Sequence, residues 1–175
     1  MLKKIAIVIV IAVLAVLGLV ATQPDSYSVT RTIAIKAPPE KIMPLISDFH
    51  NWPQWSPWEK LDPNLKRTFS GAPQDLGAVY AWEGNKDVGS GRMQITSLTP
   101  LSKVGIKLEF FSPMASLAQT DFVLQPQGDM TNVTWTMSGK SGFATRLMTV
   151  FTSLDKMIGP DFEKGLAQLK AVAEK

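Results

Sequence analysis

Few residues in this chain have the type and spacing needed for acid–base chemistry. His50 is the single histidine, and its place at the end of a predicted helix favours a surface or capping role over catalysis. Glu83 and Asp121 lie on predicted strands where alternation leaves their direction open. They are the candidate catalytic groups if the chain is an enzyme. Arg92 and Glu109 point away from the apolar face of their strands and are expected to be solvated.

Several kinds of site are excluded by composition. The 175 residues include no cysteine, which rules out disulfides, thiolate metal sites and cysteine nucleophiles. One histidine cannot form the usual multi-histidine metal centre, and no serine–histidine–aspartate set or glycine-rich phosphate loop is present. We therefore expect no metal and no cofactor.

The net charge of +3 does not indicate a nucleic-acid partner. Lys3 and Lys4 precede the folded part, which leaves 16 basic against 15 acidic residues from position 24 onward. No stripe of lysine and arginine follows one face of a predicted element, as binding to a phosphate backbone would require.

Aromatic side chains carry the stronger signal. Trp52, Trp55 and Trp58 fall within seven residues and are separated by two prolines, too irregular for a strand or a long helix. Such a cluster either plugs the end of the core or lines and gates a pocket mouth. Eight apolar residues are candidates for binding a ligand: Trp52, Trp55, Trp82, Phe110, Phe122, Trp135, Phe151 and Ile158.

The N-terminal segment predicts a contact with the membrane. Ile5 to Ala21 is 17 residues without a charge, roughly 25 Å as a helix, which is marginal for a bilayer core of about 30 Å. A cleaved signal peptide is the alternative, but Leu19 or Val16 would occupy the position where a small residue is needed. We interpret residues 1–22 as an anchor or signal segment, 23–26 as a linker and 27–175 as one domain. Lys3 and Lys4 stay in the cytoplasm, so the domain is expected outside the cytoplasm, on a single-pass protein of a bacterial inner membrane.

The remaining sequence predicts an α+β fold. Strand-like segments with one apolar face recur between short turns, which favours an antiparallel meander of about seven strands. Apolar residues from Phe143 to Lys175 recur every three or four positions, so we expect one long amphipathic helix with a kink or short break at Gly159-Pro160. A curved sheet that grips this helix tends to leave a cavity, because a straight helix cannot fill a concave surface.

The chain resembles the SRPBCC superfamily, also called START-like or birch-pollen-allergen-like, and within it the bacterial polyketide cyclase/dehydrase branch. The resemblance covers about residues 27 to 174 and rests on five segments: Ala37-Pro38-Pro39-Glu40-Lys41, Asp48 to Trp58, Gly77 to Gly84, Gly89 to Met93, and Gly159 to Leu166. It implies a helix-grip fold around a ligand cavity. Similar proteins bind lipids, hormones, polyketides or quinones there, and only some are enzymes.

Three functions fit these observations. The first is an anchored domain outside the cytoplasm that binds a lipid, quinone or polyketide-like molecule. The second is a metal-free cyclase or dehydratase that uses the same cavity and needs a buried ionisable group. The third is a protein-interaction module with a filled core, which would lack a continuous cavity of about 300 Å³ or more.

Overall fold

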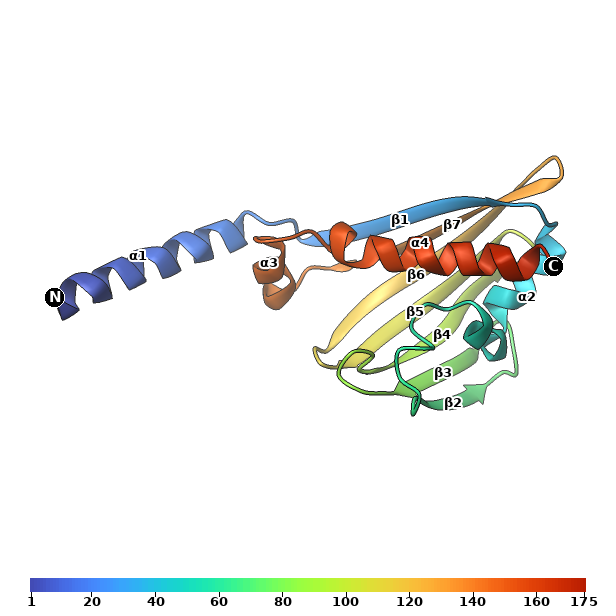
Figure 1. Cartoon of the computed structure of the whole chain (residues 1–175), viewed down its shortest axis with the longest axis horizontal. Coiled ribbons are helices and arrows are strands. Elements are labelled where there is room, and N and C mark those ends of the chain that lie inside the picture. Colours follow the sequence, from blue (N-terminus) through green and yellow to red (C-terminus); the bar gives the residue numbers. More distant parts are fainter.

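A seven-stranded antiparallel sheet forms the body of the protein in a computed structural model that describes residues 1–175. Its strands lie in the order β1-β7-β6-β5-β4-β3-β2. The sheet is strongly curved, and its concave face holds the helices (Figure 1). The strands are β1 (Ser26–Ile35), β2 (Lys66–Gly71), β3 (Ala78–Glu83), β4 (Ser90–Thr99), β5 (Lys103–Ser112), β6 (Ser116–Gln127) and β7 (Met130–Lys140).

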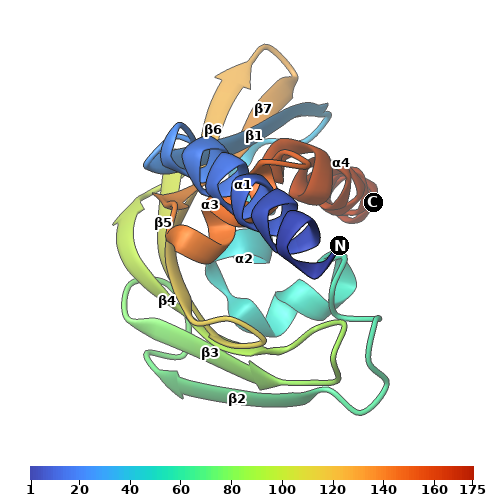
Figure 2. The same cartoon turned by 90° about the vertical axis from the view of Figure 1, so that its left-hand side faces the viewer.

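Helices lie on the concave face and close one of its ends, and a further helix projects from the other end. They are α1 (Leu2–Ala21), α2 (Pro39–Ser47), the short 3-10 helix η1 (Phe49–Gln54), α3 (Phe143–Thr149) and α4 (Leu154–Ala173). Viewed from the N-terminal end, α4 packs along β1 while β2 to β5 curve away beneath α2 and η1 (Figure 2). The predicted α+β class and helix-grip architecture are confirmed.

Alternating side chains build the core. On β7, Val133, Trp135 and Met137 are buried while the residues between them are partly exposed, as expected for a sheet with one solvated face. On α4, the buried face comprises Phe162, Leu166 and Leu169, spaced at helical intervals. The sheet and α4 thus share one apolar core.

The expected single C-terminal helix with a break at Gly159-Pro160 is wrong. The break lies at residues 150–153, and α4 runs through Pro160. Ser153 ends the break as an N-cap, where its hydroxyl accepts a hydrogen bond from the Lys156 N–H at 3.2 Å. Sequence periodicity cannot show such a break, because Phe151 continues the apolar spacing across it.

An arginine on β1 holds α4 on both sides of the proline. The guanidinium of Arg31 donates to Asp155 and to Glu163, each at 2.7 Å. These carboxylates flank Pro160, so the clamp offsets the backbone hydrogen bond that the proline removes. The same contacts lower the pKa of Asp155 from its usual range. Gly159 lies directly under Arg31, where an added Cβ would overlap with the guanidinium.

The helix α1 projects from one end of the domain (Figure 1), and only Val20 near its C-terminus is buried. It is the one helix that is long and apolar enough to cross a membrane, a test of length and composition that a signal sequence also passes.

Gly159→Ala tests the clamp. Alanine favours helix over glycine by about 1 kcal/mol, but here its methyl group displaces Arg31. We expect the substitution to be neutral or destabilising in the native chain and stabilising by about that amount in an Arg31→Ala background. Urea unfolding of the four proteins of this cycle measures the coupling. Equal effects of Gly159→Ala in both backgrounds would contradict the clamp.

Candidate functional site

A cavity of about 360 Å³ lies between the concave sheet and the helices, lined by 21 residues of which 13 are hydrophobic. Its volume falls within the range of small-molecule sites, about 300–1,000 Å³. A protein-interaction module with a filled core does not fit this interior. The curvature that the sequence implied has therefore left space beneath α4.

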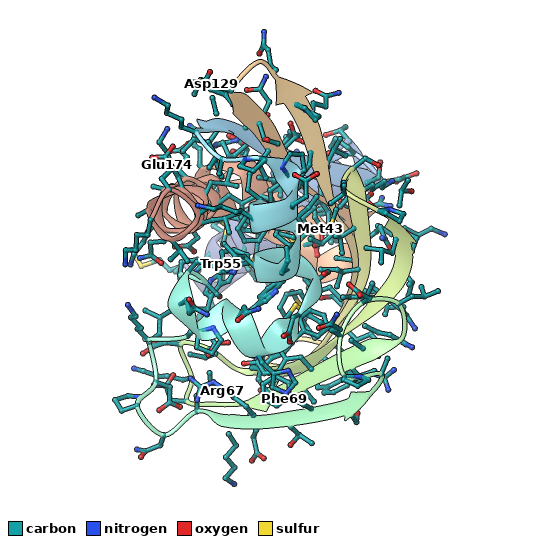
Figure 3. All side chains as sticks on the ribbon, turned by 90° about the vertical axis from the view of Figure 1, so that its right-hand side faces the viewer. Met43, Trp55, Arg67, Phe69, Asp129 and Glu174 are labelled. Atoms are coloured by element: carbon teal, nitrogen blue, oxygen red, sulfur yellow. The ribbon has the colours of Figure 1, made fainter.

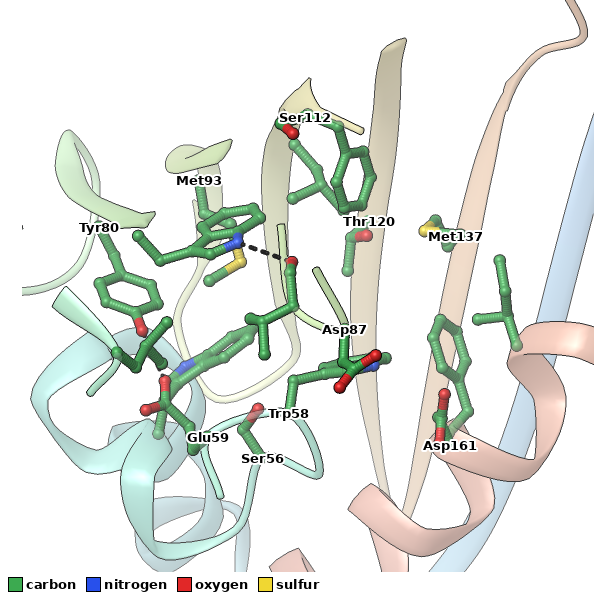
Figure 4. Close-up of a pocket in the computed structure, with 18 of the residues that line it drawn as sticks. Ser56, Trp58, Glu59, Tyr80, Asp87, Met93, Ser112, Thr120, Met137 and Asp161 are labelled. Carbon is green, nitrogen blue, oxygen red and sulfur yellow. Dashed lines mark hydrogen bonds between the residues drawn. The ribbon is translucent and has the colours of Figure 1, made fainter. Parts of the chain in front are cut away.

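Five adjacent strands supply the floor of the cavity. Their inward side chains are Tyr80 and Trp82 on β3, Met93 on β4, Leu108 and Phe110 on β5, Thr120 on β6, and Trp135 and Met137 on β7 (Figure 4). Gly91 on β4 makes this arrangement possible, because a side chain there would overlap with the Trp82 ring. That ring instead crosses β4 and meets Phe110 edge to face at 5.9 Å.

The cover comes from the segment around η1 and from α4. Trp52, Ser56, Trp58 and Glu59 approach from one side, and Ile158, Asp161 and Phe162 from the other. Figure 4 shows Trp58 and Glu59 facing the sheet residues across the space. Trp135 of β7 stacks on Phe162 of α4 with 4.0 Å between ring centres. This contact connects the floor of the cavity to its cover.

One end of the cavity is closed and the other is open. At the end away from α1, α2 and η1 close the interior, with Met43 and Trp55 directed inward (Figure 3). The exposed lining residues Lys86, Asp87, Ser112 and Pro113 belong to the β3–β4 turn and the β5–β6 hairpin, so the mouth lies there.

The mouth and the N-terminal helix lie at the same end of the sheet. The register pairs Ser26, the first residue of β1, with Lys140, the last residue of β7. The β5–β6 hairpin and the β3–β4 turn follow at the same edge, because every neighbouring pair of strands is antiparallel. The cavity therefore opens on the side from which α1 emerges.

A buried carboxylate stands in the apolar wall. The Glu59 side chain is only 4% exposed. One of its oxygens accepts a hydrogen bond from the Tyr80 hydroxyl at 2.7 Å, and the other accepts one from Arg67 Nε at 2.6 Å. A charge in such a place is retained when it is paired and hydrogen-bonded. The cluster gives the cavity a polar point among aromatic side chains.

Burial, followed by the hydrogen bond to Glu59, raises the pKa of the Tyr80 phenol well above its usual value near 10. The hydrogen bond to Glu59 also raises the pKa of Arg67. Near neutral pH the Tyr80 phenol is therefore neutral, and it lies beside the salt bridge between Arg67 and Glu59. Such an arrangement suits the recognition of a polar group on a ligand better than proton transfer by the phenol.

Five of the eight predicted ligand-binding residues line the cavity: Trp52, Trp82, Phe110, Trp135 and Ile158. Trp52 fills both roles considered for its segment, since its indole N–H donates to the Ile46 carbonyl at 2.9 Å while part of its ring faces the cavity. The tryptophan cluster thus closes the core and lines the pocket.

The other three predicted residues, Trp55, Phe122 and Phe151, do not line this cavity. Trp55 donates its indole N–H to the Leu45 carbonyl at 2.7 Å. This hydrogen bond directs the ring into the packed core, where it is fully buried. Phe122 is covered by Trp52 and Trp55. Phe151 falls in the break between α3 and α4 and is 78% exposed. Helical periodicity had placed it on the buried face of a continuous helix.

Neither candidate catalytic carboxylate reaches the cavity. Glu83 is 72% exposed and pairs with Lys66, while Asp121 faces the convex side and pairs with Lys103 at 3.3 Å. His50 has the expected surface role, with Nδ1 2.8 Å from Asp48 and its ring stacked on Phe69. Sequence reasoning missed Glu59, for which the only signal was its position directly after Trp58.

Residues 26–174 match the sequence family described as polyketide cyclase / dehydrase and lipid transport. The chain belongs to this family. The predicted resemblance is thereby confirmed for both the SRPBCC fold and this branch. No curated protein matches the chain in sequence.

Solved structures confirm the fold. The Aha1 dimer from Colwellia psychrerythraea aligns with a TM-score of 0.60 at 20% identity, covering 85% of this chain and 96% of that one. DynU16, from the dynemicin biosynthetic locus, gives 0.59 at 15% identity over 87% of this chain and 48% of its own. Major latex-like protein 151 from Panax ginseng gives 0.57 at 13% identity, with 86% and 97% covered. At such identities the likeness is one of fold.

Tyr80→Phe tests the buried cluster through alkaline stability. A raised pKa in the folded state means that the unfolded chain loses this proton first, so stability falls as pH rises above about 10. The chain has two tyrosines, and burial also raises the pKa of Tyr27. Urea unfolding between about pH 9 and 11.5 should show that Tyr80→Phe removes most of this slope and Tyr27→Phe a smaller part. An unchanged slope in Tyr80→Phe would contradict the buried hydrogen bond.

Proposed function

We propose that this chain is a membrane-anchored protein that binds an apolar small molecule in the cavity beneath α4. In this proposal residues 1–22 are the anchor, 23–26 the linker and 27–175 the binding domain. Lys3 and Lys4 remain in the cytoplasm, and the domain lies outside it.

The observation that carries the proposal is a cavity of about 360 Å³ with an aromatic wall. An empty apolar space of this size costs the fold dispersion contacts that a guest would restore. Binding would be driven by burial of apolar area, at roughly 25 cal/mol per Å² before the costs of association. Family membership supports the same reading, because the family description includes lipid transport.

The polar point in the wall narrows the ligand class. Glu59 keeps spare acceptor capacity beside the Tyr80 hydroxyl, so a ligand with one hydroxyl or similar donor group and a long apolar body fits best. Lipids, quinols and polyketide-like molecules have this form. A pure hydrocarbon would leave the carboxylate without any ligand contact.

A cyclase or dehydratase that uses the same cavity is the second candidate. It is favoured by Glu59, a buried carboxylate at the cavity wall, in place of Glu83 and Asp121. Glu59→Gln separates the two functions. If the protein dehydrates its ligand, ligand recovered from the wild type is lighter by one water than ligand recovered from Glu59→Gln. If it cyclises the ligand without loss of water, the two recovered ligands have equal mass but separate on chromatography. If it only binds, both proteins yield the same ligand by mass and by chromatography.

Filling the cavity tests the binding function. Leu108 lines the cavity, whereas Leu124 lies in solid core and is 1% exposed. We expect Leu108→Phe to weaken binding of a fluorescent long-chain alcohol at least tenfold while costing less than about 1 kcal/mol of stability. The matched control Leu124→Phe should cost about 1–3 kcal/mol through overpacking and leave binding intact.

Fluorescence titration and urea unfolding of the detergent-solubilised chain measure both quantities. Retained binding in Leu108→Phe, or no binding in the wild type, would contradict the proposal.

A further inference from the structure

Large apolar side chains are exposed at the end of the domain where α1 enters. We define the apolar rim as Phe111, Met114, Leu117, Phe143 and Phe151. Leu117 is 59% exposed and Phe143 is 62% exposed. Phe111, Met114, Leu117 and Phe143 surround one open groove together with Ser26–Ser28, the first residues of β1. Exposed apolar surface of this kind marks an interaction site.

The anchor fixes how far this rim can lie from a bilayer. The linker, residues 23–26, spans at most about 14 Å when extended. It is shorter than that here, because the Thr22 and Gln23 N–H groups still bond to carbonyls of α1. Arg146 of α3 pairs with Asp25 of the linker, and the Ser141 N–H bonds to the Asp25 carbonyl at 2.8 Å. The structure thus holds α3 at the base of α1, where the membrane surface would be.

The break in the C-terminal helix explains why these side chains have no partner within the domain. Phe143 and Phe151 continue the apolar spacing of α4, but the break at residues 150–153 separates them from the sheet. Their sequence pattern is that of a buried face, whereas both side chains are exposed. The helix α3, which begins at Phe143, lies beside α1 (Figure 2). An apolar face next to a membrane anchor is matched by the lipid surface.

The rim also borders the cavity mouth. The β5–β6 hairpin carries Phe111 and Met114 of the rim and, between them, Ser112 and Pro113 of the mouth. Phe110 lines both the cavity and the open groove. A molecule leaving a bilayer at the rim would reach the cavity without crossing water.

From these observations, and on the basis of the proposed function, we propose that the apolar rim rests on the bilayer and that the cavity takes its ligand directly from the membrane. The ligand is then a molecule dissolved in the lipid phase. The rim is the contact that holds the mouth against the lipid phase.

The absence of native cysteine allows single labels to test this contact in the full chain. An environment-sensitive fluorophore is placed at Leu117→Cys or Phe151→Cys after reconstitution into phosphatidylcholine and phosphatidylglycerol vesicles. Controls are Leu76→Cys, which has the same 59% exposure in the β2–β3 connection at the opposite end, and Asp129→Cys at the β6–β7 turn. Figure 3 places Asp129 at the tip of that far end.

Nitroxides on lipid acyl chains should quench the labels at 117 and 151 and leave those at 76 and 129 unchanged. Unquenched labels at 117 and 151 would overturn the inference, whether they sit in water or against a second protein copy.

Transfer kinetics supply an independent readout. We expect Leu117→Asn combined with Phe151→Asn to slow uptake of the same fluorescent long-chain alcohol from vesicles by about tenfold, whereas Leu76→Asn has no effect. Binding of the same probe delivered in detergent should be unchanged in all variants. Equal uptake rates would overturn the inference while leaving the proposed function intact. Loss of binding in detergent in the wild type would instead contradict the proposed function itself.

Discussion

α4 can lie against only one side of the concave sheet. It packs along β1, where Gly159 lets it pass under Arg31, and it approaches Trp135 of β7 and Pro57 closely at Gly165. The strands from β6 to β2 curve away from it (Figure 2). A straight helix on a curved sheet leaves a gap between the helix and the strands that curve away from it. The side chains that fill this gap determine whether a ligand cavity remains.

The chain fills that gap unevenly. At one end, Trp52 and Trp55 bond to carbonyls of α2 and close the interior with aromatic rings. At the other end, nothing comparable enters, and the space opens between the β3–β4 turn and the β5–β6 hairpin. The buried pair of Glu59 and Arg67, with Tyr80, places one polar point in this otherwise apolar space. The space thus combines an apolar wall with a single polar cluster, on which the proposed ligand class rests.

Sequence reasoning succeeds where periodicity and burial coincide. Alternation along β7 and helical spacing along α4 both reflect one buried face, so the sheet, its cover and five cavity residues could be predicted. Sequence reasoning fails where two residues that form a hydrogen bond are far apart in the sequence. Asp155 and Glu163 hold α4 across Pro160 only because Arg31 arrives from β1, and Glu59 meets Tyr80 only through the fold. Phe151 fits the spacing of a buried face, yet the break exposes it.

Native mass spectrometry of the full chain, extracted from membranes in mild detergent, shows whether the cavity beneath α4 holds a ligand. We expect a wild-type protein that carries one bound apolar molecule per chain, and a Leu108→Phe variant that carries none. Wild-type chains released without any bound mass, or a Leu108→Phe variant that retains the same mass, would contradict the presence of a ligand in the space beneath α4.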